Sequence, residues 1–190
     1  MKANVPLQDR WDPEPRWPAL IAVSAVGGLY LALPAYLIVG PRWLFPVVVV
    51  LLLIPTVISH RTGKHHLDRI LGFTVSVLVT LGMIASLTLL IAALPAHKES
   101  PTALLLSATS LWFTNILVFA LWYWRLDAGG PHGRDLRLGH PDGAFLFPQM
   151  TMLPDVKAGA GQEAWSPNFL DYLFLAFNTS TAFHRRMCRC

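Results

Sequence analysis

The polar side chains that could do chemistry in this chain of 190 residues lie inside or beside apolar runs. They are an aspartate, two asparagines and a short hydroxyl-rich tract. Such groups need hydrogen-bonding partners in an apolar setting, and inside a membrane they mark solute or ion paths. We therefore predict a polar path lined by Asn115, Asp171, Asn178, Thr179, Ser180 and Thr181. The alternative is that these side chains only join helices to one another.

Two of these residues have a simpler local interpretation. Asn115 lies near the middle of an apolar run, where an amide that joins helices is favoured over one that contacts a solute. Asn168 can cap the start of a helix, and Asp171 would then lie in its first turn, where the helix dipole favours a negative charge.

Residues 60–69 hold three histidines and one aspartate, which are residue types that bind zinc. Adjacent histidines rarely point at one ion, however, and the three cations of this loop would repel it. A turn at Gly63 with a basic face on anionic lipid is the favoured interpretation. No nucleophile elbow, phosphate-cradling glycine loop or HExxH motif occurs, so we predict no catalytic residue, no metal, no cofactor and no enzymatic activity.

Four apolar runs must position these residues, and each is about the length that crosses a ~30 Å bilayer core as a helix. The composition agrees, with 54% hydrophobic and only 14% charged residues. We predict an all-α, polytopic transmembrane helix bundle of four spans plus a partial fifth segment. The spans are residues 18–39, 43–59, 70–94 and 102–124.

The rest of the chain is divided around this membrane domain of residues 18–124. We expect a cytoplasmic amino-terminal tail (1–17), an extramembrane loop (125–168), a partial fifth hydrophobic segment (169–183) and a separate tail (184–190). The loop contains turn-forming residues at 127–131, and its apolar residues 145–148 could rest at the membrane surface.

Small residues recur at four-residue spacing within the predicted spans. Ser24, Gly28 and Ala32 form one such row, and Gly82 and Ser86 form another. This spacing lets helix backbones approach closely, so we expect these rows to pack inside the bundle.

The distribution of lysine and arginine predicts the orientation. Nine of them flank one set of span ends, and only Arg42 and Lys98 flank the other. The nine are Lys2, Arg10, Arg16, Arg61, Lys64, Arg69, Arg125, Arg134 and Arg137. We therefore expect a multi-pass protein of the cell inner (plasma) membrane with a cytoplasmic amino terminus. Its expected partner is the lipid bilayer, homo-oligomerisation is left open, and no basic helix or aromatic platform indicates nucleic acid.

Residues 110–183 resemble a family of uncharacterised bacterial multi-spanning membrane proteins, a domain of unknown function. The resemblance rests on Leu-Trp-Tyr-Trp-Arg at 121–125, Phe-Leu-Phe-Pro at 145–148, Pro-Asn-Phe-Leu-Asp-Tyr at 167–172 and Phe-Asn-Thr-Ser-Thr-Ala-Phe at 177–183. The last segment is also distantly similar to a potassium-channel pore helix, although no Gly-Tyr-Gly follows Thr181. The resemblance implies a membrane bundle and no established activity.

The final seven residues depart from that family, which typically continues with a segment like Ser-Pro-Thr-Asp-Val and a further span. Reading the tail one base earlier, with CGN arginine codons, allows Pro-Thr-Asp-Val. We therefore expect a frameshift after Phe183, with residues 184–190 translated out of frame and at least one carboxy-terminal span missing.

Two functional classes follow from these patterns. The first is a channel-like or small-solute transport protein that uses the polar path. The alternative is a structural or partner-binding membrane protein without transport activity.

Overall fold

The computed structural model describes residues 14–61, 65–96, 99–135, 143–152, 156 and 166–181. The predicted turn at Gly63, most of the tail 1–17 and the predicted out-of-frame tail 184–190 lie outside the described residues.

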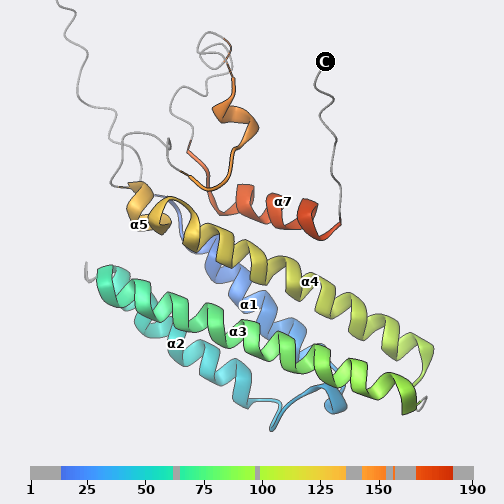
Figure 1. Ribbon diagram of the computed structural model, residues 1–190. Coiled ribbons are helices and arrows are strands. Elements are labelled where there is room, and N and C mark those ends of the chain that lie inside the picture. The colour runs from blue at the N-terminus through green and yellow to red at the C-terminus, as the bar shows by residue number, and fades with distance from the viewer. Residues whose placement is uncertain are drawn as a thin grey trace, which may run out of the picture.

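The described residues are helical and contain no strand, which confirms the all-α class. Four long helices form a bundle in which neighbours in sequence run in opposite directions (Figure 1). They are α1 (Trp17–Ala32), α2 (Leu44–Arg61), α3 (His65–Ala93) and α4 (Pro101–Leu126). The shorter helices are η1 (Ala35–Leu37), η2 (Leu94–Ala96), η3 (Asp127–Gly129), α5 (Gly130–Asp135), η4 (Pro148–Met150) and α7 (Phe169–Ser180).

Only two helices of the described part are long and apolar enough to cross a membrane, by length and composition. They are α3 from Arg69 and α4 with its continuation to Arg134, whereas α1 and the Leu44–Pro55 part of α2 are shorter apolar helices. The four predicted spans are therefore confirmed only as four apolar helices.

The predicted first span, residues 18–39, is not one continuous helix. α1 ends at Ala32, and Leu33 is extended, with φ −67° and ψ 145°. Pro34 explains the break, because a proline lacks the N–H that would continue the helix and disfavours helical backbone at the residue before it. Arg42 then donates to the Leu33 carbonyl oxygen at 3.0 Å, which satisfies an acceptor at this end of α1.

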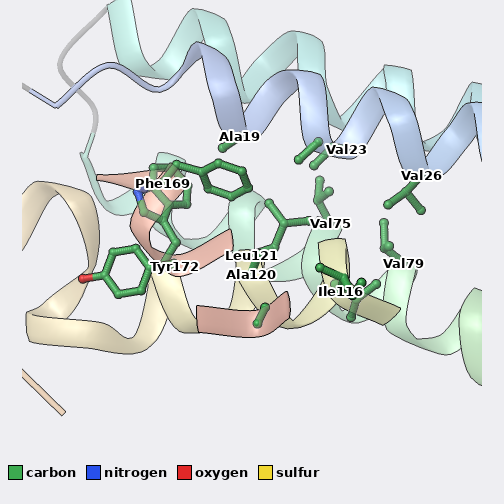
Figure 2. Close-up of a cluster of buried hydrophobic side chains, with 14 of the residues drawn as sticks. Ala19, Val23, Val26, Val75, Val79, Ile116, Ala120, Leu121, Phe169 and Tyr172 are labelled. Atoms are coloured by element: carbon green, nitrogen blue, oxygen red, sulfur yellow. The ribbon is translucent and has the colours of Figure 1, made fainter. Parts of the chain in front are cut away.

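α4 is the central helix, because α1, α3 and α7 all pack against it. α7 lies on the face of α4 turned away from α2 and α3 (Figure 1). The main core joins α1, α2, α3, α4 and α7, and Figure 2 shows side chains from four of these helices converging. The labelled residues are Ala19, Val23 and Val26 of α1, Val75 and Val79 of α3, Ile116, Ala120 and Leu121 of α4, and Phe169 and Tyr172 of α7.

The outer surface of the bundle is also apolar. Large hydrophobic side chains are exposed on each of the long helices and on α7, for example Ile21, Leu51, Leu81, Leu105 and Phe174. The hydroxyl groups on these helices mostly donate to carbonyl oxygens four residues earlier in the same helix. A helix bundle whose outer surface is apolar, like its core, is typical of a lipid environment.

Of the two rows of small residues predicted to pack inside the bundle, one is packed and the other is exposed. Gly82 packs as predicted, because a Cβ built on it would lie 2.6 Å from the ring of Phe45 on α2, and Ser86 is buried. Ser24, Gly28 and Ala32 are exposed, and a Cβ built on Gly28 meets nothing within 4 Å. The prediction that the α1 row packs inside the bundle is therefore wrong for the described part of the chain.

Gly82→Ala should lower the thermal unfolding temperature of the protein in detergent, since the new methyl group displaces the Phe45 ring, and overpacking costs about 1–3 kcal/mol. Gly28→Ala is the matched control. It should leave stability unchanged or raise it slightly, because alanine is the better helix former and has open space here. Equal melting temperatures for the two variants would contradict the close contact between α2 and α3.

Candidate functional site

A tight turn at the end of α4 brings polar side chains together. Ala128, Gly129 and Gly130 all have positive φ, at 51°, 82° and 82°. A Cβ on Gly130 would lie 2.9 Å from the Arg125 carbonyl oxygen, so both backbone angle and space favour glycine there. The turn chemistry predicted at 127–131 is confirmed, and it folds α5 back against α4.

The carboxylate of Asp127 lies fully buried at this turn. One of its oxygens accepts a hydrogen bond from the phenol of Tyr172 on α7 at 2.6 Å. The other accepts from the backbone N–H of Ala144 at 2.5 Å. A buried carboxylate is costly unless it is hydrogen-bonded, and here both oxygens have donors from distant segments. Asp127 therefore fastens α7 and the 143–152 segment to the end of α4.

Arg134 of α5 makes the second half of this polar cluster. Its guanidinium donates to Glu14 at 2.7 and 3.1 Å, and to the carbonyl oxygens of Trp124 and Asp127 at 2.9 and 3.0 Å. It also lies over the ring of Tyr172, 5.1 Å from the ring centre. A cation at the carboxyl end of a helix satisfies free carbonyl groups and complements the helix dipole. Arg134 thus caps α4.

Glu14 completes the cluster from the segment before α1. Besides its ion pair with Arg134, it accepts a hydrogen bond from the indole N–H of Trp124 at 2.5 Å. The residues Glu14, Trp124, Asp127, Arg134 and Tyr172 are called the polar cluster below.

Burial raises the pKa of the Tyr172 phenol well above its ordinary value, and the nearby Arg134 charge only partly opposes this effect. The phenol therefore stays protonated at neutral pH and remains a donor to Asp127. Asp127 and Tyr172 have no exposed surface. The polar cluster therefore joins segments that lie far apart in the sequence.

The start of α7 follows the sequence prediction. Asn168 accepts from the Leu170 N–H at 2.9 Å, and Asp171 accepts from the Asn168 N–H at 2.8 Å, which makes a capping box. Burial raises the pKa of the Asp171 carboxyl, and this hydrogen bond from the backbone opposes the rise. Asp171 therefore has a defined local role at the start of the helix.

The residues predicted to line a polar path do not gather at one place. Asp171 lies at the first turn of α7, whereas Asn178 is about 10 Å further along that helix by its rise. The hydroxyls of Thr179, Ser180 and Thr181 donate to carbonyl oxygens of α7 itself. Asn115 on α4 is half-buried and, among the described residues, its amide makes no hydrogen bond.

An open groove of about 760 Å³ lies between α1, α4 and α7. Its lining is apolar. The groove residues are Ala25, Gly28 and Leu29 of α1, Phe113, Ile116 and Leu117 of α4, and Leu170, Leu173, Phe174 and Phe177 of α7. Leu170, Phe174 and Phe177 follow the i, i+4, i+7 spacing of one helix face and are exposed. This surface has the shape of a helix-packing groove.

Sequence reasoning missed the polar cluster. The sequence predicts only a turn at Asp127 and only a flanking cation at Arg134, and it indicates no structural role for Glu14. The signal that could have indicated the cluster is Asp127 itself. This carboxylate lies just after a membrane-length apolar run, at the carboxyl end of a helix, where a negative charge is unfavourable without a partner. Residues 145–148 are divided between the polar cluster and the surface. Phe147 is buried against the Tyr172 ring and Phe145 is half-buried beside it, whereas Leu146 and Pro148 are exposed.

No group of three His, Cys, Asp or Glu residues that could hold a metal ion occurs in the described part of the chain. No family model matches this chain, and no curated protein or solved structure matches it either. The resemblance to uncharacterised bacterial membrane proteins, and that to a potassium-channel pore helix, stay predictions.

Arg134→Gln should destabilise the protein by about 3–5 kcal/mol, because it leaves the Glu14 carboxylate without its cation and removes the cap of α4. The free energy of unfolding in detergent measures this. The control is Arg69→Gln, at an exposed arginine, which should change stability by less than about 0.5 kcal/mol. Similar values for the two variants would contradict the structural role of the polar cluster.

Proposed function

We propose that this chain is a multi-pass protein of the inner (plasma) membrane, with four helices crossing the bilayer and a cytoplasmic amino-terminal side. The alternating directions of the helices support this arrangement. The start of α1 at Arg16, the start of α3 near Arg69 and the end of α4 at Arg125 all lie at the same end of the bundle (Figure 1). Arg42 lies at the other end, and positive charge favours the cytoplasmic side. α1 and α2 rise about 24 and 27 Å, close to the ~30 Å bilayer core.

Single-cysteine accessibility tests this topology. With Cys188 and Cys190 replaced by serine, Val39→Cys and Glu99→Cys should react with a membrane-impermeant maleimide from outside intact cells. Leu146→Cys should react only after the membrane is opened, because Leu146 lies at the end where the polar cluster lies and is 78% exposed. Labelling of Leu146→Cys in intact cells would contradict the orientation. Protection of Val39→Cys would contradict the crossing of α1 and α2.

Within that membrane setting, we propose a structural, partner-binding role in which the groove receives a helix of a second copy of this chain. The observation that carries the proposal is the apolar groove itself. It has small residues, Ala25 and Gly28, on one wall and large exposed residues, Leu170 and Phe174, on the other. Small residues on a membrane helix allow close helix approach.

The two walls of the groove are complementary in shape, because the small residues of α1 form a hollow and the large residues of α7 form a ridge. A two-fold axis beside the groove would place the ridge of each copy, formed by Leu170 and Phe174, against the small residues of the other copy. Such an isologous contact closes as a dimer and needs no other chain. The open space around Gly28 leaves room for this approach.

Gly28→Leu should reduce self-association in liposomes, because its side chain would fill the hollow. Energy transfer between donor and acceptor dyes on Leu146→Cys, in the cysteine-free background, measures association. The control is Ala108→Leu, at an exposed position of α4 outside the groove, which should leave the transfer unchanged. Wild-type transfer in Gly28→Leu, or no transfer above random proximity in the unsubstituted protein, would contradict the dimer.

Small-solute transport is the second candidate function. The observation that favours it is that the amides of Asn115 and Asn178 are half-buried on packed helices without a hydrogen bond among the described residues. Solute flux in liposomes that is abolished by Asn115→Leu together with Asn178→Leu would support transport over the structural role.

A further inference from the structure

A second apolar groove runs along the outer face of α3 and begins at a cation. It encloses about 680 Å³ and is lined by Arg69, Ile70, Phe73, Thr74, Val77, Leu78 and Leu81. We propose that this groove binds one anionic phospholipid, with the lipid phosphate on Arg69 and an acyl chain along the apolar residues. The proposal rests on the membrane location proposed above and concerns a site separate from the α1, α4 and α7 groove.

Charge complementarity identifies the headgroup. Arg69 is exposed and, among the described residues, makes no hydrogen bond or ion pair, so its guanidinium is available to a ligand. A guanidinium binds phosphate through paired N–H donors. In the proposed orientation Arg69 faces the cytoplasmic leaflet, whose anionic lipids attract positive charge near the surface.

The apolar part of the groove matches an acyl chain in chemistry. Ile70, Val77 and Leu81 are 49%, 44% and 60% exposed, so lipid can reach them directly. The one hydroxyl in the lining, that of Thr74, donates to the Ile70 carbonyl oxygen at 3.0 Å. This hydroxyl therefore needs no hydrogen bond from a ligand, and Thr74 does not interrupt the apolar lining.

The groove also matches one leaflet in length. From Ile70 to Leu81 the helix rises about 16 Å, and half of a ~30 Å bilayer core is about 15 Å. A lipid whose phosphate lies at Arg69 would therefore reach the end of the groove near the bilayer centre. The ring of Phe73 is held in place by an edge-on contact with Trp122, whose centre lies 5.9 Å away. Trp122 in turn donates to the Thr80 hydroxyl at 2.9 Å, so this wall of the groove is fixed before lipid binds.

Native mass spectrometry of the protein released from nanodiscs tests the proposal. The nanodiscs contain phosphatidylglycerol and phosphatidylcholine in equal amounts. The unsubstituted protein should retain phosphatidylglycerol preferentially, and Arg69→Gln should weaken that retention about fivefold, the size expected for one surface cation on anionic lipid. Val77→Trp should weaken retention as well, by filling the groove.

Leu105→Trp is the matched control, because Leu105 is 68% exposed on α4 and lies outside the groove. It should retain phosphatidylglycerol like the unsubstituted protein. Equal retention of the two lipids, or unchanged retention in both Arg69→Gln and Val77→Trp, would overturn the lipid site. A protein that inserts into nanodiscs but shows no lipid preference would count against this site alone. A protein that does not insert at all would count against the proposed membrane location.

Discussion

The arrangement of the carboxy-terminal half depends on one buried carboxylate. Asp127 lies where α4 ends, has no exposed surface, and is matched by donors from Tyr172 and Ala144, which are 45 and 17 residues away. Leaving a buried carboxylate without donors costs several kcal/mol, so the two distant segments must return to it. The Tyr172 phenol can approach Asp127 only when α7 lies along α4, and in Figure 2 its oxygen points away from the apolar cluster that the ring joins.

The position of α7 then determines which surfaces remain open. Because α7 packs on α4 and only lightly on α1, Ala25 and Gly28 of α1 are left uncovered and a groove remains between the three helices. Gly82 and Gly28 illustrate the difference, since Phe45 fills the space beside the first and nothing in the described chain fills the space beside the second. In lipid, where apolar surface alone does not drive helix association, such close-approach surfaces are where helices meet.

Residue patterns along the sequence predicted the helices, caps and turns, but they did not predict the contacts between residues that lie far apart in the sequence. The apolar runs predicted helices, the Asn168 cap and Asp171 predicted where α7 begins, and the glycines after Asp127 predicted a turn. Pro34 divided a run that hydrophobicity alone treated as continuous. The ion pair of Glu14 with Arg134 joins residues 120 positions apart, and neither residue differs in type or spacing from an ordinary flanking charge. Whether a row of small residues is covered also depends on tertiary packing, which residue spacing does not determine.

A double-mutant cycle between Asp127 and Tyr172 tests the central claim, that this hydrogen bond fastens α7 to α4. The free energy of unfolding in detergent is measured for Asp127→Ala, Tyr172→Phe and the double variant, with Tyr123→Phe in place of Tyr172→Phe as the matched control. We predict a coupling energy of about 1.5–3 kcal/mol for Asp127 with Tyr172, the range for a hydrogen bond to a charged group, and none with Tyr123. Additive effects for Asp127→Ala and Tyr172→Phe would contradict the account.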